Sequence, residues 1–477
     1  MYILMVVIFI LGYIGIALEH NFRVDKAASA LLTGVLVWTI FVFGADSILG
    51  VNYSWSIQDF ISNSGQYIKA FREFVVGINP AEINADETVA SLTNHFVVHE
   101  LEHHLIEISE ILFFLIGAMT IVELIDAHEG FSVITDKIKT TKKVPLIWIL
   151  ATLTFFFSAA LDNLTTAIVM SALLKKLIKD REDLWLFAGM IIISANAGGA
   201  WSPIGDVTTI MLWIGGQISA AAVIQNVFLP SLVAAIVPLV ILSFTMKGNI
   251  QRPDLREDEH ELNPTTPFER KLVFFLGVIS LLFVPVYKTV THMPPFMGIL
   301  LGLGFMWVVT ELIHRSKNTE EKSQLSVISV LRKIDTPSVL FFLGILIAVA
   351  GLQSAGHLVA AARMLETQIG NIYTINVIIG LLSSIVDNVP LVAGAMGMYE
   401  IGPLQAGVAY PMDHNFWEFL AYCAGTGGSC LIIGSAAGVA VMGIMKIDFV
   451  WYLRKVSFLA LIGYLAGAAT YILMFAL

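Results

Sequence analysis

Two apolar segments in the first half of the chain are interrupted by polar residues, and the second half repeats both interruptions. The first pair of breaks lies at residues 158–166 and 196–206, and the second pair lies at residues 382–390 and 425–435. A carboxylate beside a broken helix inside a bilayer is costly, and it is tolerated mainly where the broken backbone lines a cavity or an ion pathway. The two matched pairs therefore predict a transporter built from two related halves.

The composition predicts a polytopic membrane protein. Of the 477 residues, 57% are hydrophobic and 13% are charged, whereas soluble domains carry roughly 25% charged residues. Cys423 and Cys430 lie in one apolar segment, a pattern that indicates neither a disulfide framework nor a thiolate metal site. Residues 1–18 have no basic leader and no cleavage site of small residues, so we expect a retained membrane span and not a signal peptide.

The apolar segments predict an all-α protein in which each half has five membrane spans, one of them broken, and one re-entrant hairpin. We expect the first half at residues 1–246, a cytoplasmic linker at 247–271 and the second half at 272–477. The expected hairpins are residues 146–178 and 374–398, and the expected broken helices are residues 184–214 and 416–445. The unbroken spans are expected at 1–18, 27–43, 111–125, 227–246, 272–287, 296–313, 339–352 and 458–475. Each arm of the first hairpin is only about 11 to 15 residues long, short of the roughly 20 that a span needs.

Corresponding motifs recur at a nearly constant distance along the chain. Asp162 and Asp387 are 225 positions apart, and Gly198 and Gly427 are 229 positions apart. Because each half has an odd number of spans, the second half enters the membrane from the opposite side. The repeats are therefore predicted to be inverted.

The basic residues give an independent test of this topology. If the N-terminus is outside, all 27 Lys and Arg residues fall in inner loops except Lys69, Arg72, Lys288 and Arg363. This distribution follows the positive-inside rule. We expect a multi-pass protein of the bacterial inner membrane with both termini outside, surrounded by lipid and without a nucleic-acid partner.

Side chains with oxygen atoms are concentrated at the breaks. Helix ends leave backbone N–H and C=O groups without partners, and sodium, like other hard cations, takes oxygen ligands. The candidate cation- and proton-binding residues are Asp162, Asn163, Thr165, Thr166, Ser202 and Asp206 in the first half and Ser384, Asp387, Asn388, Thr426 and Ser429 in the second. An aspartate in such a place can hold a cation or a proton in turn, which predicts exchange. Asn163, Asn388 and the serines also suit simple helix caps.

Six glycines mark the two broken helices: Gly198, Gly199, Gly205, Gly427, Gly428 and Gly434. They are expected to permit the breaks, although glycines in these positions also suit close packing. Glu123 lies inside the predicted span at 111–125. It is a candidate proton relay, and a carboxylate that reaches interfacial water is the alternative interpretation.

A polar region at residues 44–107 is expected to hold short amphipathic helices around residues 55–76. Within it, His99, Glu100 and His103 match the His-Glu-x-x-His motif of zinc proteases, with His104 adjacent. A zinc enzyme also needs a third protein ligand and a cleft, and neither is evident. We therefore expect no zinc-type metal site, no enzymatic activity and no cofactor, and we interpret these residues as capping the approach to the next span.

The motifs at the breaks resemble those of the ion transporter superfamily. The resemblance rests on Asp162-Asn163 at a hairpin tip, followed by the pattern Asn-x-Gly-Gly-x-x-Ser-Pro-Ile-Gly-Asp at residues 196–206. The run at residues 107–128 is similar to that of the NhaD-type sodium/proton antiporters, and the resemblance covers nearly the whole chain. It implies a homodimer whose scaffold domain supports a moving transport domain with both hairpins and both broken helices. It also implies exchange of Na⁺ or Li⁺ for protons by alternating access, in the service of pH homeostasis.

The hairpin tips separate two members of this superfamily. In its divalent-anion symporters the tips read Ser-Asn-Thr, whereas here they read Asp162-Asn163-Leu164 and Asp387-Asn388-Val389. An acid repels a dicarboxylate and can accept a proton, so cation exchange is favoured over the alternative, an anion or oxyanion carrier for dicarboxylate or arsenite. No Arg or Lys lies near the breaks in the sequence, so anion binding would rest on helix N-termini alone. Ser435 stands where the first half has Asp206, so the sequence leaves open whether the two halves bind cations equivalently.

Overall fold

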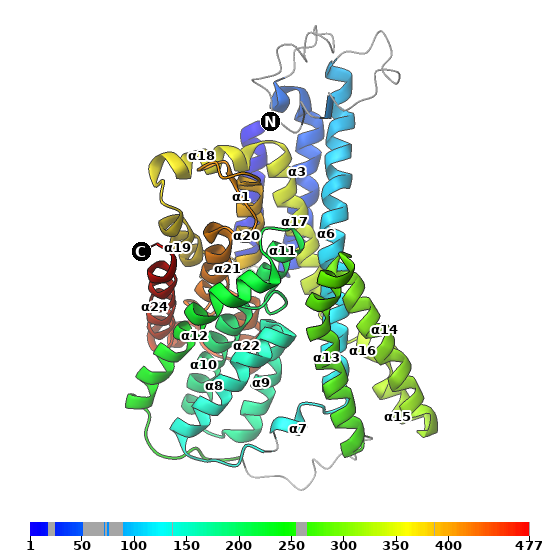
Figure 1. Cartoon of the computed structure of the whole chain (residues 1–477), viewed down its shortest axis with the longest axis vertical. Coiled ribbons are helices and arrows are strands. Elements are labelled where there is room, and N and C mark those ends of the chain that lie inside the picture. The colour runs from blue at the N-terminus through cyan, green and yellow to red at the C-terminus, as the bar shows by residue number, and fades with distance from the viewer. Residues whose placement is uncertain are drawn as a thin grey trace.

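A computed structural model describes residues 1–17, 24–50, 71, 74–75, 89–135, 137–253, 265–385 and 387–476. These residues are almost entirely helical (Figure 1). The helices up to the linker are α1 (Tyr2–Ala17), α3 (Lys26–Leu49), α6 (Val89–Ala127), α7 (Ser132–Thr135), α8 (Lys143–Leu161), α9 (Asn163–Leu177), α10 (Arg181–Ala200), α11 (Val207–Ile214) and α12 (Ala220–Thr245).

The second part of the chain begins with α13 (Pro267–Thr291) and ends with α24 (Ser457–Phe475). Between them lie α14 (Pro295–Ile313), η4 (His314–Ser316), α15 (Thr319–Leu325), α16 (Val327–Leu331), α17 (Thr336–Ser354), α18 (His357–Gln368), α19 (Ile372–Leu382), α20 (Asn388–Met398), α21 (Asn415–Gly427), α22 (Ala436–Met445) and α23 (Phe449–Lys455). Two short parallel strands, β1 (Glu400–Ile401) and β2 (Ala409–Tyr410), form the sheet of the described chain.

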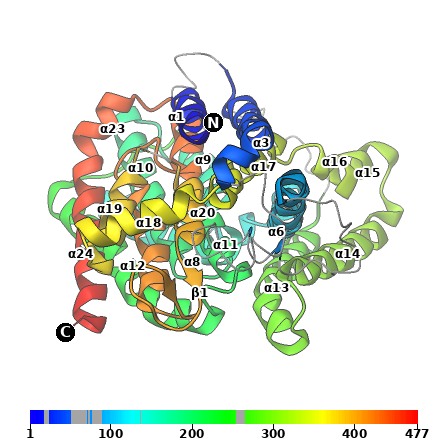
Figure 2. The same ribbon diagram turned by 90° about the horizontal axis from the view of Figure 1, so that it is seen from above.

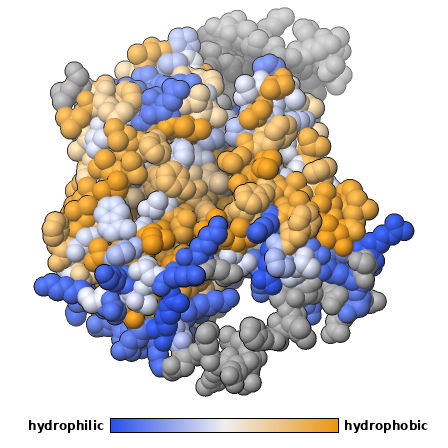
Figure 3. Space-filling model, turned by 60° about the horizontal axis from the view of Figure 1, so that its bottom comes forward, coloured by the Kyte–Doolittle hydropathy of each residue, from blue (hydrophilic) through white to orange (hydrophobic). Residues whose placement is uncertain are grey.

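The described helices confirm the prediction of an all-α polytopic membrane protein. Nine of them are long and apolar enough to cross a membrane, or up to ten if the bent pair of α22 and α23 forms one span. Apolar side chains form a broad band over the surface, and hydrophilic ones gather along its lower edge (Figure 3). This distribution is typical of a protein whose middle lies in hydrocarbon.

The helices form two groups that are visible from above (Figure 2). One group holds α13, α14, α15 and α16 together with α6, which packs on both α13 and α14. The other holds α8–α12 and α19–α24, in which α10 packs on α8 and α12 packs on α24. Helix α17 packs on α6 of the first group and on α20 of the second, so it lies between the groups, with α3 packed against it.

Both pairs of breaks belong to the second group. Helices α8 and α9 approach from the lower side of Figure 1, and α19 and α20 approach from the upper side. The turn between α8 and α9 is the single residue Asp162, with φ 84° and ψ 157°. This backbone region is essentially restricted to glycine and costs on the order of 1–3 kcal/mol for other residues. Such strain persists where the surrounding structure holds the residue in place.

Glycines allow each hairpin to lie directly against the broken helix that follows it. A Cβ atom on Gly198 would fall on the carbonyl oxygen of Phe155 in α8. In the same way, a Cβ atom on Gly427 would fall on the carbonyl oxygen of Gly380 in α19. The hydroxyls of Ser158 and Ser383 reinforce the two contacts by donating to the carbonyls of Ala195 (2.5 Å) and Ala424 (2.8 Å). Gly198 and Gly427 therefore serve close packing, the alternative role considered for these glycines, at corresponding places in both halves.

Three predicted boundaries were wrong. The span expected at residues 111–125 is part of the 39-residue helix α6, so the His99–His104 stretch continues that span and does not cap it. Leu and Glu favour helix, and the His99–His104 stretch has no proline that would end it. Helix α8 has 19 residues and is long enough to cross a membrane, so the first arm is not short. Helix α3 also runs six residues further than expected, to Leu49.

Two other predicted segments lie largely outside the described residues. Of the amphipathic region at 55–76, only Phe71, Phe74 and Val75 are described. The middle of the linker, residues 254–264, is also outside the described part of the chain.

The glycine contacts predict a sharp difference between alanine substitutions. Gly198→Ala and Gly427→Ala force a methyl group onto backbone that cannot rotate away, so each variant should lose thermal stability and folded yield. Gly443→Ala in α22 is the matched control, because a Cβ atom there has no neighbour within 4 Å. It should fold at least as well as the parent, since alanine favours helix by about 1 kcal/mol over glycine. Equal melting temperatures for all three variants in detergent would show that the close approach is not needed.

Candidate functional site

Each helix break places a polar side chain at the N-cap of the helix that follows. Asp162 caps α9 by accepting from Thr165 N (2.8 Å), and Asp206 caps α11 by accepting from Thr208 N (3.0 Å). Asp387 caps α20 by accepting from Val389 N (3.2 Å), and Ser435 caps α22 by accepting from Gly438 N (3.1 Å). Short polar side chains are the preferred N-caps because they satisfy the free N–H groups of the first turn.

The Asp206 carboxylate lies between the two hairpin tips. Asn163 of the first tip donates to its Oδ2 atom (2.9 Å), and Asn388 of the second tip donates at 3.3 Å to Oδ2 and 3.5 Å to Oδ1. All three side chains are buried, with exposed fractions of 1 to 4%. A buried carboxylate has to be matched by hydrogen bonds or by a bound cation. Asp206 therefore joins two motifs that are far apart in the sequence.

Asn196 extends this network to the second broken helix. Its Oδ1 atom accepts from Asn163 (3.1 Å), and its Nδ2 group donates to the hydroxyls of Ser429 (2.9 Å) and Ser435 (3.0 Å). Asn196 is fully buried. The network consequently connects both hairpin tips and both broken helices through side chains alone.

Asp162 has a different surrounding from Asp206. Its Oδ1 atom accepts from the backbone of Thr165, and its Oδ2 atom accepts from the hydroxyl of the same residue (2.7 Å). Each carboxylate oxygen has two lone pairs, so acceptor capacity is left over on both atoms. Asp162 lines a small cavity, where that capacity is available to a cation or a proton.

Asp387 lies beside a lysine, which corrects the prediction that no Arg or Lys is near the breaks. Lys26 Nζ is 3.8 Å from Asp387 Oδ2, and it also lies 4.5 Å from the centre of the Phe341 ring. Lys26 is the first residue of α3. The contact joins positions 361 residues apart, so the local sequence around the break gives no sign of it.

The cavity at the breaks has a volume of about 30 Å³. Three carboxyl groups line it, those of Asp162, Asp206 and Asp387, together with the side chains of Asn163 and Asn388. A volume of this size holds one or two water-sized particles, whereas pockets for organic ligands measure roughly 300–1,000 Å³. The cavity therefore has room for a single dehydrated ion and not for an organic ligand.

A second cavity, of about 190 Å³, adjoins the small one and shares Leu164, Ser338 and Ala436 with it. Asp25 and Lys26 also line this second cavity. It lies where α3 and α17 begin. The small cavity therefore borders the cavity of about 190 Å³ on the side where α3 and α17 begin.

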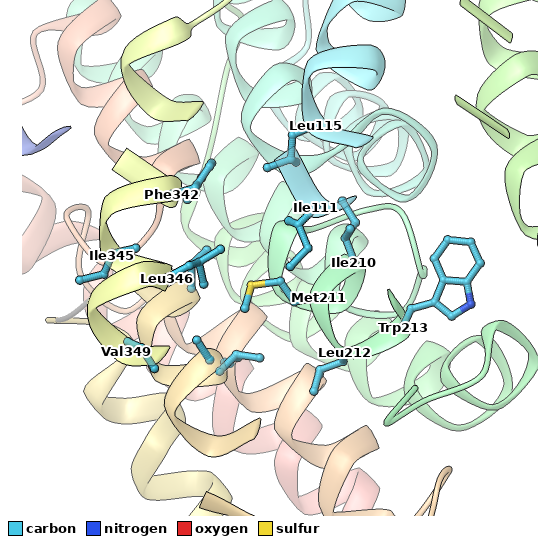
Figure 4. Close-up of a cluster of buried hydrophobic side chains, with 14 of the residues drawn as sticks. Ile111, Leu115, Ile210, Met211, Leu212, Trp213, Phe342, Ile345, Leu346 and Val349 are labelled. Atoms are coloured by element: carbon cyan, nitrogen blue, oxygen red, sulfur yellow. The ribbon is translucent and has the colours of Figure 1, made fainter. Parts of the chain in front are cut away.

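A third cavity, of about 390 Å³, lies on the other side and shares no described lining residue with the small one. The buried hydrophobic cluster of Figure 4 has side chains from α6, α11 and α17, and some of its members line each of the two cavities. Ile111 and Leu346 face the large cavity, whereas Leu115 and Phe342 line the small one. These pairs are one helical turn apart on α6 and α17, so the apolar barrier is about one turn thick.

Other predicted site residues have structural contacts. The hydroxyl of Ser202 donates to Ala159 O (2.5 Å), that of Ser384 to Leu381 O (2.7 Å) and that of Thr426 to Tyr422 O (2.5 Å). The Thr166 hydroxyl is buried without a hydrogen-bond partner in the described structure. Glu123 is half-buried on α6 and lines none of the three cavities. The structure thus brings together Asp162, Asn163, Thr165, Asp206, Asp387, Asn388 and Ser429 from the predicted set.

Sequence reasoning missed three residues of the site. Asn196 and Ser435 stand at the ends of the motifs that defined the breaks, and their polar side chains in apolar sequence were a usable signal. Lys26 was assigned to an inner loop, because its position just before an apolar segment is typical of a flanking charge.

The fold and the site define a polytopic membrane transporter with an ion-sized cavity between two broken helices and two hairpins. The chain matches the family model described as "Citrate transporter" over residues 4–417, and it belongs to that family. It is 43% identical over 470 residues to sodium/proton antiporter 1 of Arabidopsis thaliana, an alignment that covers 98% of this chain and 72% of that relative. It is also 33% identical over 400 residues to the Na⁺/H⁺ antiporter NhaD of Vibrio cholerae, covering 78% of this chain and 80% of the relative. These matches confirm the resemblance stated from the motifs.

The position of Asp206 predicts that its charge is needed for cation binding. Asp206→Asn keeps the size and the N-cap of α11, but it removes the charge and sets one amide against another, so sodium affinity should fall by at least about tenfold, or 1.4 kcal/mol. Binding can be measured with radioactive Na⁺ on purified protein. Ser202→Ala is the control, because its hydroxyl faces the Ala159 carbonyl and its loss should leave sodium affinity unchanged. Unaltered affinity in Asp206→Asn would reduce Asp206 to a helix cap.

Proposed function

We propose that the chain is a secondary active antiporter that exchanges Na⁺ or Li⁺ for protons by alternating access. The observation that carries this proposal is the cavity at the breaks, where three carboxyl groups surround room for one ion, with the Lys26 ammonium 3.8 Å from one of them, Asp387. The names of the relatives support it, since those from Arabidopsis and from Vibrio are called sodium/proton antiporters.

An anion carrier is the second candidate, and two observations favour it. The N-termini of α9, α11, α20 and α22 meet at the site and present the positive ends of their dipoles there, and Lys26 adds a positive charge. The four helix ends are already occupied by capping side chains, however, and three of those are carboxyl groups. The cavity of about 30 Å³ is also about ten times smaller than a pocket for an organic anion. Cation exchange is therefore the better interpretation.

Exchange follows from competition for the carboxyl groups. A hard cation in the cavity needs oxygen ligands with negative charge, which Asp162 and Asp206 offer in their ionised forms. When the cation leaves, an unpaired buried carboxylate is costly, so uptake of a proton is the favourable alternative. One binding site thus holds a cation or a proton, and each arrives as the other leaves.

Lys26 gives Asp387 a separate role in this scheme. Opposite charges at about 4 Å attract by on the order of 4 kcal/mol when the effective dielectric constant is about 20. This is comparable to the binding energy of a weakly held ion, since a millimolar dissociation constant corresponds to about 4 kcal/mol. We propose that the Lys26 ammonium takes the place of a cation at Asp387 while the site is empty and moves aside when Na⁺ binds.

We propose that alternating access connects the ion site in turn to the cavity of about 190 Å³ and to the cavity of about 390 Å³. In the described conformation, the ion site adjoins the cavity of about 190 Å³ and is separated from the cavity of about 390 Å³ by the apolar barrier. We propose that the group with both hairpins and both broken helices moves as the transport domain. The group with α6, α13 and α14 is then the scaffold domain.

The remaining parts of the proposal concern assembly and topology. We propose two inverted repeats, residues 1–246 and 272–477, joined by the cytoplasmic linker, in a homodimer formed through the scaffold domains. The paired glycine contacts of Gly198 and Gly427 support the repeat, because each lies at the same place relative to its own hairpin. The distribution of basic residues supports both termini outside. The proposed location is the inner membrane of a bacterium, where the exchange serves pH homeostasis.

The hairpin aspartates allow transport to be separated from folding. Asp162→Asn and Asp387→Asn retain the N-caps of α9 and α20, since asparagine and aspartate cap helices about equally well. Both variants should insert and fold, yet lose at least about tenfold in Na⁺-driven proton movement into proteoliposomes, measured with a pH-sensitive dye. Asp180→Asn, the same change at the N-cap of α10 outside the cavity, should keep full exchange.

A third variant tests the part of Lys26. Lys26→Met removes the competing ammonium, so the Na⁺ concentration for half-maximal exchange should fall, and adding Asp387→Asn should abolish that gain. Near-normal exchange in both aspartate variants would contradict the proposed antiport mechanism. Exchange driven by a dicarboxylate or by citrate, but not by Na⁺, would establish the anion carrier instead.

The topology is tested by labelling an introduced thiol in a protein without Cys423 and Cys430. Asp254→Cys in the linker should react with a membrane-impermeant reagent only from the cytoplasmic side. Arg363→Cys on α18, which is exposed, is the matched control and should react only from outside. Labelling of both positions from the same side would overturn the inverted repeat.

A further inference from the structure

Helix α6 carries a cluster of metal-ligating side chains at a distance along the helix from the ion site. One nitrogen each from His103 and His104 and one oxygen from Glu107 lie within 4.8 Å of one another. His104 is buried, whereas His103 and Glu107 are exposed. We propose that these three residues bind a single divalent transition metal ion of the zinc class, with a water molecule as the fourth ligand.

The hydrogen bonds of His104 leave the correct nitrogen free for a metal. The Ser354 hydroxyl donates to Glu100 Oε2 (3.0 Å), so it can only accept from His104 Nε2, which lies 3.1 Å away. The Nε2 atom therefore carries a proton, which leaves Nδ1 as the nitrogen that can offer a lone pair to a metal. The Nδ1 atom faces Glu107 Oε2 at 3.5 Å. Histidine ligands of metals are characteristically oriented by a hydrogen bond from the other ring nitrogen.

The distances are close to those of an occupied site. Ligand atoms around a tetrahedral zinc ion lie roughly 3.4 Å apart, because each is about 2.0–2.2 Å from the metal. The His104 Nδ1 and Glu107 Oε2 atoms already have this separation, and His103 Nδ1 is 3.9 Å from Glu107 Oε1. Only the exposed side chains have to rotate, while the buried histidine stays in place. Two imidazoles and a carboxylate form a donor set suited to Zn²⁺, Co²⁺ and Ni²⁺.

This site differs from the one that the protease motif would form. The motif pairs His99 with His103, but His99 is not part of the cluster. Its glutamate, Glu100, accepts from Ser354 and supports His104. The third ligand that seemed to be missing from the sequence is Glu107, one helical turn beyond the histidines, where residues four apart share a face.

The location gives the metal a regulatory consequence. His104 and Glu107 line the cavity of about 390 Å³, which is enclosed by α6, α11, α17 and α20. Through Ser354, His104 also connects α6 to the end of α17. A bound ion fixes these side chains at the wall of the cavity, so we expect it to slow exchange from the side on which the cavity opens.

The experiment measures metal binding by the purified full-length chain after removal of any histidine tag. Co²⁺ is the probe, because a four-coordinate ion gives strong visible absorption, and Zn²⁺ is then added in competition. The parent should bind one equivalent. His104→Ala should lose the four-coordinate spectrum, and Ser354→Ala should weaken binding by about 10- to 100-fold, as loss of an orienting hydrogen bond does elsewhere. His99→Gln is the control and should bind like the parent.

The outcomes separate this proposal from the proposed antiport. Absence of a four-coordinate spectrum in the parent, or an unchanged spectrum in both His104→Ala and Glu107→Gln, would overturn the metal site. Loss of binding in His99→Gln would overturn it in favour of the His99–His103 pair. Because the readout is the spectrum of the bound metal, it holds whether or not the chain exchanges Na⁺ for protons. Slower exchange with added Zn²⁺ in the parent, but not in His104→Ala, would establish the regulatory consequence.

Discussion

The hydrogen bonds between Asp206 and the two hairpin asparagines are the contacts on which the arrangement of the site depends. Asn163 and Asn388 come from opposite hairpins, and both amides donate to one buried carboxylate. That geometry requires both hairpins to end at the same depth in the protein. It also requires the broken helix formed by α10 and α11 to be interrupted beside the two hairpin tips. The glycine contacts of Gly198 and Gly427 provide this fit, because they bring each broken helix against its own hairpin. Packing and the ion site are therefore parts of one arrangement.

The sequence predicted what depends on local pattern and missed what depends on long-range contact. The breaks, the hairpin tips and the candidate residues Asp162, Asp206 and Asp387 were predictable, because a carboxylate in an apolar segment is a strong local signal. Lys26 was not predictable, since its contact with Asp387 is made across the fold. Serine and threonine gave the weakest predictions. Their hydroxyls suit ion binding and bonding to a backbone carbonyl equally well, and Ser202 and Thr426 make the latter contact.

The three carboxyl groups at the site are not equivalent, although the two halves of the chain share their motifs. Asp162 accepts from the neutral groups of Thr165, Asp206 accepts from two amides, and Asp387 lies beside an ammonium. Ser435 is the N-cap residue after the break in the second half, as Asp206 is in the first, and its side chain is uncharged. One strong cation site near Asp162 and Asp206 is more consistent with these contacts than two equal sites. The second half then supplies Asn388 and Asp387, and Lys26 of the first half pairs with Asp387 as an internal cation beside the same site.

The thickness of the apolar barrier bears on how far the domains must move. A single helical turn separates the residues that face the large cavity from those that line the ion site on both α6 and α17. A relative shift of about one turn, roughly 5.4 Å, would exchange these positions along a helix. In the proposed mechanism, the same shift of the group with both hairpins would draw the tip of α20 away from Lys26, because α3 is outside that group and packs closely on α17 through Gly34 and Gly344. Release of Lys26 from Asp387 and opening of the barrier are thus expected to be coupled through the contact of α3 with α17.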